Sequence, residues 1–158
     1  MPDITIYTDG AASGNPGPGG YGIILKSGNH YKELSQGYKL TTNNRMELKA
    51  VIVALKSLKI RGSKVDIYTD SLYVHDAVEK GWLWQWEKQR FKKKKNSDLW
   101  MEFIEVYKKH HVKFHWVRGH SAIPENERCD RLAVKASQSV KLLTDTGYIN
   151  DVEQETMW

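Results

Sequence analysis

Cysteine is almost absent from this sequence. Cys129 is the single cysteine among the 158 residues, so the chain has no partner for an internal disulfide. Nothing in the composition therefore indicates an oxidising compartment. Because a free cysteine usually behaves as a small apolar residue, we expect Cys129 to lie in the core.

Long apolar runs are also missing. No stretch approaches the roughly 18 residues of a transmembrane helix, and the first residues enter a strand-like run that leaves no room for a signal peptide. With 40% hydrophobic residues, the chain is predicted to be globular. The cytoplasm is the simplest location for such a chain.

Two frequent kinds of catalytic site are absent as well. No group of Cys and His residues has the spacing of a zinc site. A segment rich in glycine and proline spans residues 14–20, but it lacks the Gly-Lys-Ser/Thr ending of a phosphate-binding loop. Zinc enzymes and nucleotide-binding P-loop proteins are therefore poor candidates.

What the sequence has instead is segregated charge. The net charge is +5, and residues 88–95 contain six basic side chains and no acidic one. The tail from residue 144 to residue 158 is acidic. A basic segment of this kind suits a polyanionic partner such as a nucleic acid.

The hydrophobic pattern predicts an α/β fold. Apolar alternation and turn residues predict strands and helices in the order β-β-β-α-β-α-α-β-α. The expected strands are residues 4–8, 21–26, 31–38, 64–69 and 112–117, and the expected helices are 45–59, 71–80, 99–110 and 124–140. This order predicts a mixed five-stranded sheet, with three antiparallel strands followed by parallel crossovers and helices on both faces. Residues 11–20 are expected to be too rich in Gly and Pro for a central strand.

The domain organisation follows from this order. Residues 1–140 are predicted to form a single domain, in which residues 82–95 are a basic, Trp-rich segment. Residues 141–158 form a tail to which the pattern assigns no role.

A repeated tetrapeptide marks two aspartates. Ile-Tyr-Thr-Asp occurs at residues 6–9 and again at residues 67–70, each time at the end of an expected strand. If the two strands are parallel neighbours, Asp9 and Asp70 leave the sheet at the same edge, where α/β sheets usually bind ligands. The alternative is a pair of solvated aspartates at strand ends.

Glu47 is unusual because of its neighbours. At helical spacing it shares one face with Ala50, Val51, Ala54 and Leu55. A carboxylate on an apolar face is costly unless it is paired or bound to a metal. The alternative is an acid near a helix N-terminus that points into water.

Asp130 is a weaker candidate. It lies beside an apolar stripe formed by Cys129, Leu132, Ala133, Ala136 and Val140. The alternatives are a partly exposed helix acid, or Glu127 as the functional acid one turn earlier. Four such carboxylates suit phosphodiester hydrolysis, because oxygen ligands favour Mg²⁺ and bound metal ions can activate a water and stabilise the leaving oxygen.

The sequence resembles the bacterial type 1 ribonucleases H. The matching segments occur in the family's order and cover residues 4 to about 140. They are Tyr7-Thr8-Asp9-Gly10, Gly14-Asn15-Pro16-Gly17-Pro18-Gly19-Gly20-Tyr21-Gly22, Thr41-Thr42-Asn43-Asn44-Arg45-Met46-Glu47, Thr69-Asp70-Ser71, Asp98-Leu99-Trp100, Val117-Arg118-Gly119-His120 and Glu125-Asn126-Glu127-Arg128-Cys129-Asp130.

The resemblance implies the ribonuclease H-like fold and a metal-dependent endonuclease. Such an enzyme hydrolyses the RNA strand of an RNA/DNA hybrid and leaves 5′-phosphate and 3′-hydroxyl ends. It implies that Asp9, Glu47, Asp70 and Asp130 bind Mg²⁺, with Mn²⁺ as a substitute, and that His120 assists proton transfer or product departure. It also implies a monomer.

The resemblance further implies the residues that bind the hybrid. Asn15, Asn43 and Asn44 correspond to contacts with the RNA strand, where an amide can match the donor and acceptor roles of a 2′-hydroxyl. Thr42 and Asn96 correspond to contacts with a DNA phosphate. In the basic segment, the expected contacts are Trp82, Trp86, Lys92 and Lys93.

Two other functions fit these residues less well. A binding module of the same fold without turnover would be expected to lack one or more of the acids, yet all four are present. A nuclease or recombinase of the wider superfamily that acts on DNA has no need of the asparagines that suit a 2′-hydroxyl.

Overall fold

The computed structural model describes residues 3–119 and 122–156. Its centre is a five-stranded sheet in the order β3-β2-β1-β4-β5. Strands β1, β2 and β3 are antiparallel neighbours, whereas β4 runs parallel to β1, and β5 runs parallel to β4. The strand bounds are β1 Asp3–Ala12, β2 Gly17–Ser27, β3 His30–Thr41, β4 Lys64–Thr69 and β5 His111–Trp116. The predicted fold class and strand directions are confirmed.

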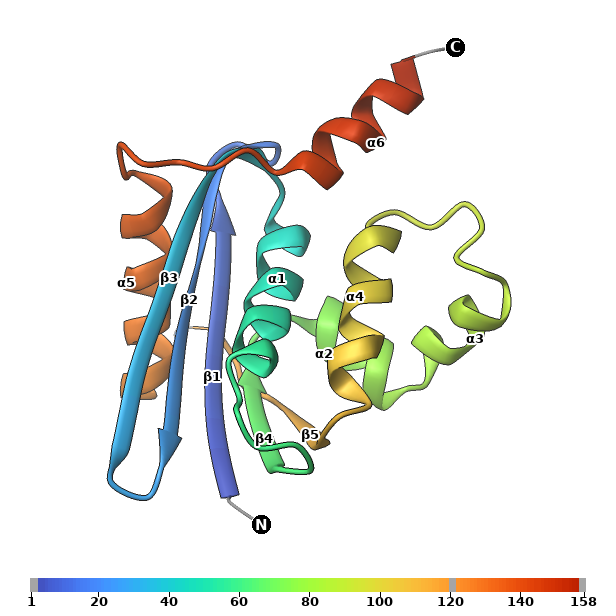
Figure 1. Ribbon diagram of the computed structural model, residues 1–158. Helices are drawn as coiled ribbons and strands as arrows, with labels where there is room; N and C mark the ends of the chain where they lie inside the picture. Colours follow the sequence, from blue (N-terminus) through green and yellow to red (C-terminus); the bar gives the residue numbers. More distant parts are fainter. Residues whose placement is uncertain (1–2, 120–121, 157–158) are drawn as a thin grey trace.

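Helices cover both faces of the sheet (Figure 1). Helix α5 packs against β1, β2 and β3 on one face, and α1 packs against β1 and β2 on the other, with α4 beside it. The helix bounds are α1 Asn43–Lys56, α2 Leu72–Glu79, α3 Trp82–Lys88, α4 Ser97–Tyr107, α5 Pro124–Ser137 and α6 Thr146–Thr156. Cys129 is fully buried, as expected. Within the described ranges, no helix combines the length and apolar character needed to cross a membrane.

The glycine-rich segment differs from its prediction. Strand β2 begins at Gly17 and lies between β1 and β3, so the expectation that residues 11–20 exclude a central strand was wrong. A Cβ at Gly20 would lie 2.6 Å from the carbonyl oxygen of Ala133, and a Cβ at Gly22 would lie 2.3 Å from that of Cys129. The glycines are there because α5 packs directly on the backbone of β2.

Two helices were not predicted. Helix α3 lies inside the basic segment, where Leu83 is fully buried and Trp84 and Trp86 pack against the core. Helix α6 lies in the acidic tail. Helix α5 ends at Ser137 rather than near Val140, which is 98% exposed. Local periodicity does not reveal α3 or α6, because most of the stability of a helix in a protein comes from tertiary packing.

Candidate metal and nucleic-acid site

The parallel pairing of β1 and β4 brings two aspartates together. Tyr7 is opposite Tyr68 in the register, and their rings stack with centroids 5.2 Å apart. Asp9 and Asp70 each follow these tyrosines by two residues, so both aspartates leave the sheet at the same edge. This is the juxtaposition that the repeated tetrapeptide predicts.

Glu47 reaches the same place from α1. The Thr42 hydroxyl accepts a hydrogen bond from the Arg45 amide and caps the helix, so Glu47 lies one turn into α1. A Cβ at Gly10 would lie only 2.4 Å from the Glu47 nitrogen. The absence of a side chain at Gly10 thus lets the helix approach β1 closely. Glu47 is buried on the predicted stripe with Ala50 and its neighbours.

Three carboxylates then form a compact cluster. Asp9, Glu47 and Asp70 each offer an oxygen within 4.8 Å of the others. Among the described residues, neither Oε1 of Glu47 nor Oδ1 of Asp70 has a hydrogen-bond partner, although both are buried. Buried oxygens without partners are costly, and a hard divalent cation would satisfy them. The donor set therefore fits a metal ion.

The acidity of the cluster reflects this crowding. Burial and the charge of Asp70 raise the pKa of Asp9 to about 8. Burial, with Asp9 and Asp70 nearby, holds the pKa of Glu47 well above its usual value. Without a cation, Asp9 and Glu47 do not both ionise at neutral pH, because like charges in a buried site repel one another.

Asp130 lies at the rim of this cluster. It belongs to α5 and lines the same cavity of about 470 Å³ as the three other acids. It is not one of the three residues whose oxygens lie within 4.8 Å of one another, but its charge contributes to the raised pKa of Asp9. The structure thus brings all four predicted acids to one cavity, with Asp130 less buried than Asp9 and Glu47.

A second cavity adjoins the first. Its volume is about 420 Å³, and we call it the amide cavity because asparagines from three segments line it. Asn43 and Asn44 line both cavities. The Asn15 side-chain oxygen accepts a hydrogen bond of 2.8 Å from the backbone N–H of Asn43. The complete lining is Asn15, Pro16, Thr42, Asn43, Asn44, Lys95, Asn96, Tyr148, Asp151 and Val152.

The amide cavity unites all five predicted polar contacts outside the basic segment. It also contains residues that sequence reasoning missed, namely Tyr148, Asp151 and Val152 of α6. Asp145 is the residue in the sequence that could have indicated the start of α6. It precedes the helix, and its carboxylate accepts a hydrogen bond of 3.4 Å from the Tyr148 backbone amide in the manner of an N-cap.

The basic segment presents only some of its expected side chains to solvent. Trp82 is 46% exposed, and Lys92 and Lys93 are exposed. Trp86 is half-buried, with its ring 5.6 Å from that of Trp100. Phe91, which stands among the basic residues of this segment, is buried in the core and is not available to a nucleic acid.

His120 lies outside the described residues. The preceding residue, Gly119, is close to the acidic cluster, since a Cβ there would lie 3.1 Å from Oδ2 of Asp70. The segment before His120 therefore approaches the cavity.

Comparisons with known proteins agree with this geometry. The family model described as RNase H matches residues 1–138. The chain is 60% identical over 151 residues to a protein named Ribonuclease H from Trichodesmium erythraeum (strain IMS101), covering 92% of this chain and 96% of that protein.

Solved structures give the same result. The crystal structure of LC9-RNase H1, a type 1 RNase H with the type 2 active-site motif, has a TM-score of 0.80 at 30% identity and covers 87% of this chain and 73% of that chain. LC11-RNase H1 in complex with RNA/DNA hybrid has a TM-score of 0.66 at 25% identity and covers 85% of this chain and 96% of that chain. With the family model spanning most of its length, the chain belongs to the ribonuclease H family.

Proposed function

We propose that this protein is an endonuclease that hydrolyses the RNA strand of an RNA/DNA hybrid, leaving 5′-phosphate and 3′-hydroxyl ends. One observation carries the proposal: a buried carboxylate cluster with unpartnered oxygens opens into a cavity that shares two asparagines with the amide cavity. The similar LC11-RNase H1 was solved with such a hybrid bound.

The acids are the proposed metal ligands. Asp9, Glu47 and Asp70 would hold Mg²⁺, or Mn²⁺ in its place, with Asp130 completing the site from the rim of the cavity. When bound, divalent cations supply an activated water and stabilise the leaving oxygen. The protein contributes a rigid cradle, because Asp9 and Asp70 are held by paired strands and Glu47 by a capped helix.

The amide cavity would bind the two strands of the hybrid. Asn15, Asn43 and Asn44 are assigned to the RNA strand, where an amide can donate to and accept from a 2′-hydroxyl. Thr42 and Asn96 are assigned to a phosphate of the DNA strand. The first three residues gather near the acidic cavity, which supports selection of RNA at the point of cleavage.

The basic segment would contribute affinity without sequence preference. Exposed Lys92 and Lys93 can neutralise phosphates, and the exposed face of Trp82 can pack on a sugar or base. Trp86 is assigned a contact as well, although Trp100 already covers part of its ring.

Proton transfer or product departure is assigned to His120, the residue that follows Gly119. The closeness of Gly119 to Asp70 supports this role. We also propose that the enzyme acts as a monomer, as its resemblance to bacterial ribonucleases H implies, and that it acts in the cytoplasm, in keeping with its single cysteine.

One assay tests the proposal. The protein is incubated with a strand-labelled hybrid, duplex DNA and duplex RNA, each with Mg²⁺ and with EDTA. We expect cleavage of the RNA strand of the hybrid only, and only with Mg²⁺, giving products that carry 5′-phosphates. Cleavage of duplex DNA, or hybrid cleavage that survives EDTA, would contradict the proposal.

A further inference from the structure

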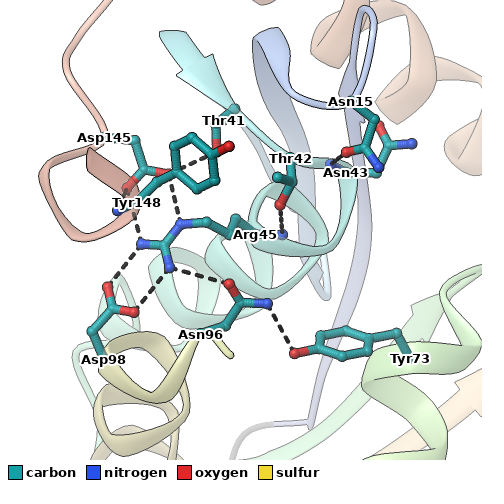
Figure 2. A network of polar contacts seen from close by, with 10 residues as sticks. All are labelled: Asn15, Thr41, Thr42, Asn43, Arg45, Tyr73, Asn96, Asp98, Asp145 and Tyr148. Atoms are coloured by element: carbon teal, nitrogen blue, oxygen red, sulfur yellow. Dashed lines mark hydrogen bonds and ion pairs between the residues drawn. The ribbon is translucent and has the colours of Figure 1, made fainter. Parts of the chain in front are cut away.

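Arg45 is a buried cation with every donor in use. Its side chain is 1% exposed, and a guanidinium has five N–H donors. Two bonds of 2.8 and 2.9 Å go to Asp145, two of 2.9 and 2.7 Å go to Asp98, and one of 3.3 Å goes to Oδ1 of Asn96 (Figure 2). Arg45 therefore has no donor left for a ligand, and its role is to hold these three groups.

The C-terminal segment supplies one of these partners. Leu143 pairs with β3 through backbone hydrogen bonds of 2.8 Å from Lys39 and 3.0 Å to Gly37. This pairing places Asp145, whose carboxylate also accepts a 2.6 Å hydrogen bond from the Thr41 hydroxyl. Asp145 is 9% exposed, so the carboxylate is built into the fold although it lies beyond the region matched by the family model.

The contact with Arg45 decides which way the Asn96 amide faces. A guanidinium only donates, so it must meet the amide oxygen, and the amide nitrogen must face the opposite side. There the nitrogen donates a 3.1 Å hydrogen bond to the Tyr73 hydroxyl. The same hydroxyl accepts from the Trp100 indole at 2.8 Å, which confirms that Tyr73 offers its oxygen. An amide nitrogen has two hydrogens, so Asn96 keeps one for a ligand in the amide cavity.

We propose that Asp145 is a positioning residue for hybrid binding: through Arg45, it fixes the Asn96 amide so that the nitrogen can offer its remaining N–H to a ligand in the amide cavity. A phosphate oxygen only accepts hydrogen bonds, so it requires this orientation and is repelled by the flipped one. The inference rests on the proposed function, because it takes the ligand of Asn96 to be a phosphate of the hybrid. It assigns to the tail a part in substrate recognition.

The packing of α6 leaves little room for another arrangement. A Cβ at Gly147 would lie 2.0 Å from Oδ2 of Asp98 and 2.6 Å from Nη2 of Arg45. Tyr148, on the same turn, lines the amide cavity. Without Asp145, Arg45 would retain only Asp98 as a charged partner, whose side chain is 41% exposed.

The test is a double-mutant cycle on the full-length enzyme, with the hybrid as substrate and Mg²⁺ present. Asp145→Asn removes the charge but keeps the shape. Asn96→Gly removes the amide and suits the left-handed backbone of that position, where φ is 62°. Each single variant is expected to raise KM about tenfold and to change kcat less than about twofold, as loss of a hydrogen bond to a charged group predicts. In the Asn96→Gly background, Asp145→Asn should raise KM no further.

Glu33→Gln is the matched control. It breaks another two-bond carboxylate–guanidinium contact, to Arg128, at 2.8 and 3.0 Å between β3 and α5, and we expect it to leave KM unchanged. If Asp145→Asn does not fold, Gly147→Ala takes its place in the same cycle, because it disturbs Arg45 and Asp98 without removing a charge.

The outcomes separate the two proposals. A wild-type enzyme that does not cleave the hybrid overturns the proposed function. If the wild type does cleave it, three results overturn the positioning role alone: an unchanged KM in Asn96→Gly, an unchanged KM in Asp145→Asn, or equal KM increases from Asp145→Asn in both backgrounds.

Discussion

Two carboxylate clusters lie beside the first turns of α1, and the pKa values of their buried aspartates shift in opposite directions. Glu47 joins Asp9 and Asp70, whereas Arg45, two residues earlier, joins Asp98 and Asp145. Residues two apart on a helix point in very different directions. The first turns of α1 therefore contribute one residue to each cluster.

Burial does not distinguish the clusters. Asp9 is 6% exposed and Asp145 is 9% exposed, yet their acidities move in opposite directions. Burial and the charge of Asp70 raise the pKa of Asp9. Burial also acts to raise the pKa of Asp145, but hydrogen bonds from Arg45 and Thr41 outweigh it and hold the pKa below its usual value. The partners of a buried carboxylate, rather than its depth, indicate whether it can receive a ligand.

The largest expected effect follows from removing a carboxylate of the acidic cluster. Asp70→Asn should lower the rate of hybrid cleavage by a factor of about 10³ or more, because it removes a metal ligand. Hybrid binding should persist, since the amide cavity and the basic segment remain. Cleavage assays and fluorescence anisotropy measure the two properties. A variant that loses its fold, judged by circular dichroism, would show that Asp70 is structural.

The next largest expected effect is a loss of stability when the cluster of Arg45, Asp98 and Asp145 loses its cation. Arg45→Met leaves Asp98 and Asp145 without their cation, so it should lower the free energy of unfolding by about 3–5 kcal/mol. Urea denaturation measures this change. Glu47→Gln, on the same helix, is the comparison, and it should leave the metal-free protein at least as stable as the wild type. Equal losses in the two variants would remove the distinction between the clusters.

A smaller effect concerns the metal-free protein at alkaline pH. The pKa of Asp9 is about 8 in the fold and 3.8 as an ordinary aspartate. The folded state thus holds the proton more tightly, and stability falls as pH rises between these values. Asp9→Asn should therefore stabilise the metal-free protein at pH 8, by about 1–3 kcal/mol. Thermal unfolding in EDTA measures this gain, which should vanish near pH 4.

The smallest expected effect concerns Asp145, whose pKa shifts in the direction opposite to that of Asp9. Because the pKa of Asp145 is lowered in the fold, its stabilising contribution is complete above its ordinary pKa and is lost as pH falls through the folded value. The wild type should therefore lose more stability than Asp145→Asn between pH 5 and pH 2. Urea titrations at a series of pH values measure the difference. Parallel pH profiles would show that Asp145 is not held by Arg45.

The acidic cluster was largely predictable from short patterns. The repeated Ile-Tyr-Thr-Asp indicated that Asp9 and Asp70 share an edge, and the parallel register confirms it. The apolar stripe identified Glu47 as a buried acid. Asp130 depended on the family resemblance, because nothing local separates it from an ordinary helix acid. The predicted metal roles of all four residues remain predictions.

The second cluster was not predictable in this way. Arg45 and Asp145 lie 100 residues apart, and the tail between residues 141 and 158 has no periodicity that reveals its docking on β3. Phe91 was not predictable either. It lies between Arg90 and Lys92 in the sequence, as a surface residue would, but its side chain is buried in the core.

By itself, the sequence determined the order of the five strands and of helices α1, α2, α4 and α5, the edge at which the aspartates meet and the presence of a buried acid on α1. These features follow from local periodicity, which repeats every two or 3.6 residues. Only the tertiary structure decided how the buried charges pair, because pairing depends on which distant segments pack together. That pairing leaves the oxygens around Glu47 available to a cation and satisfies those around Arg45.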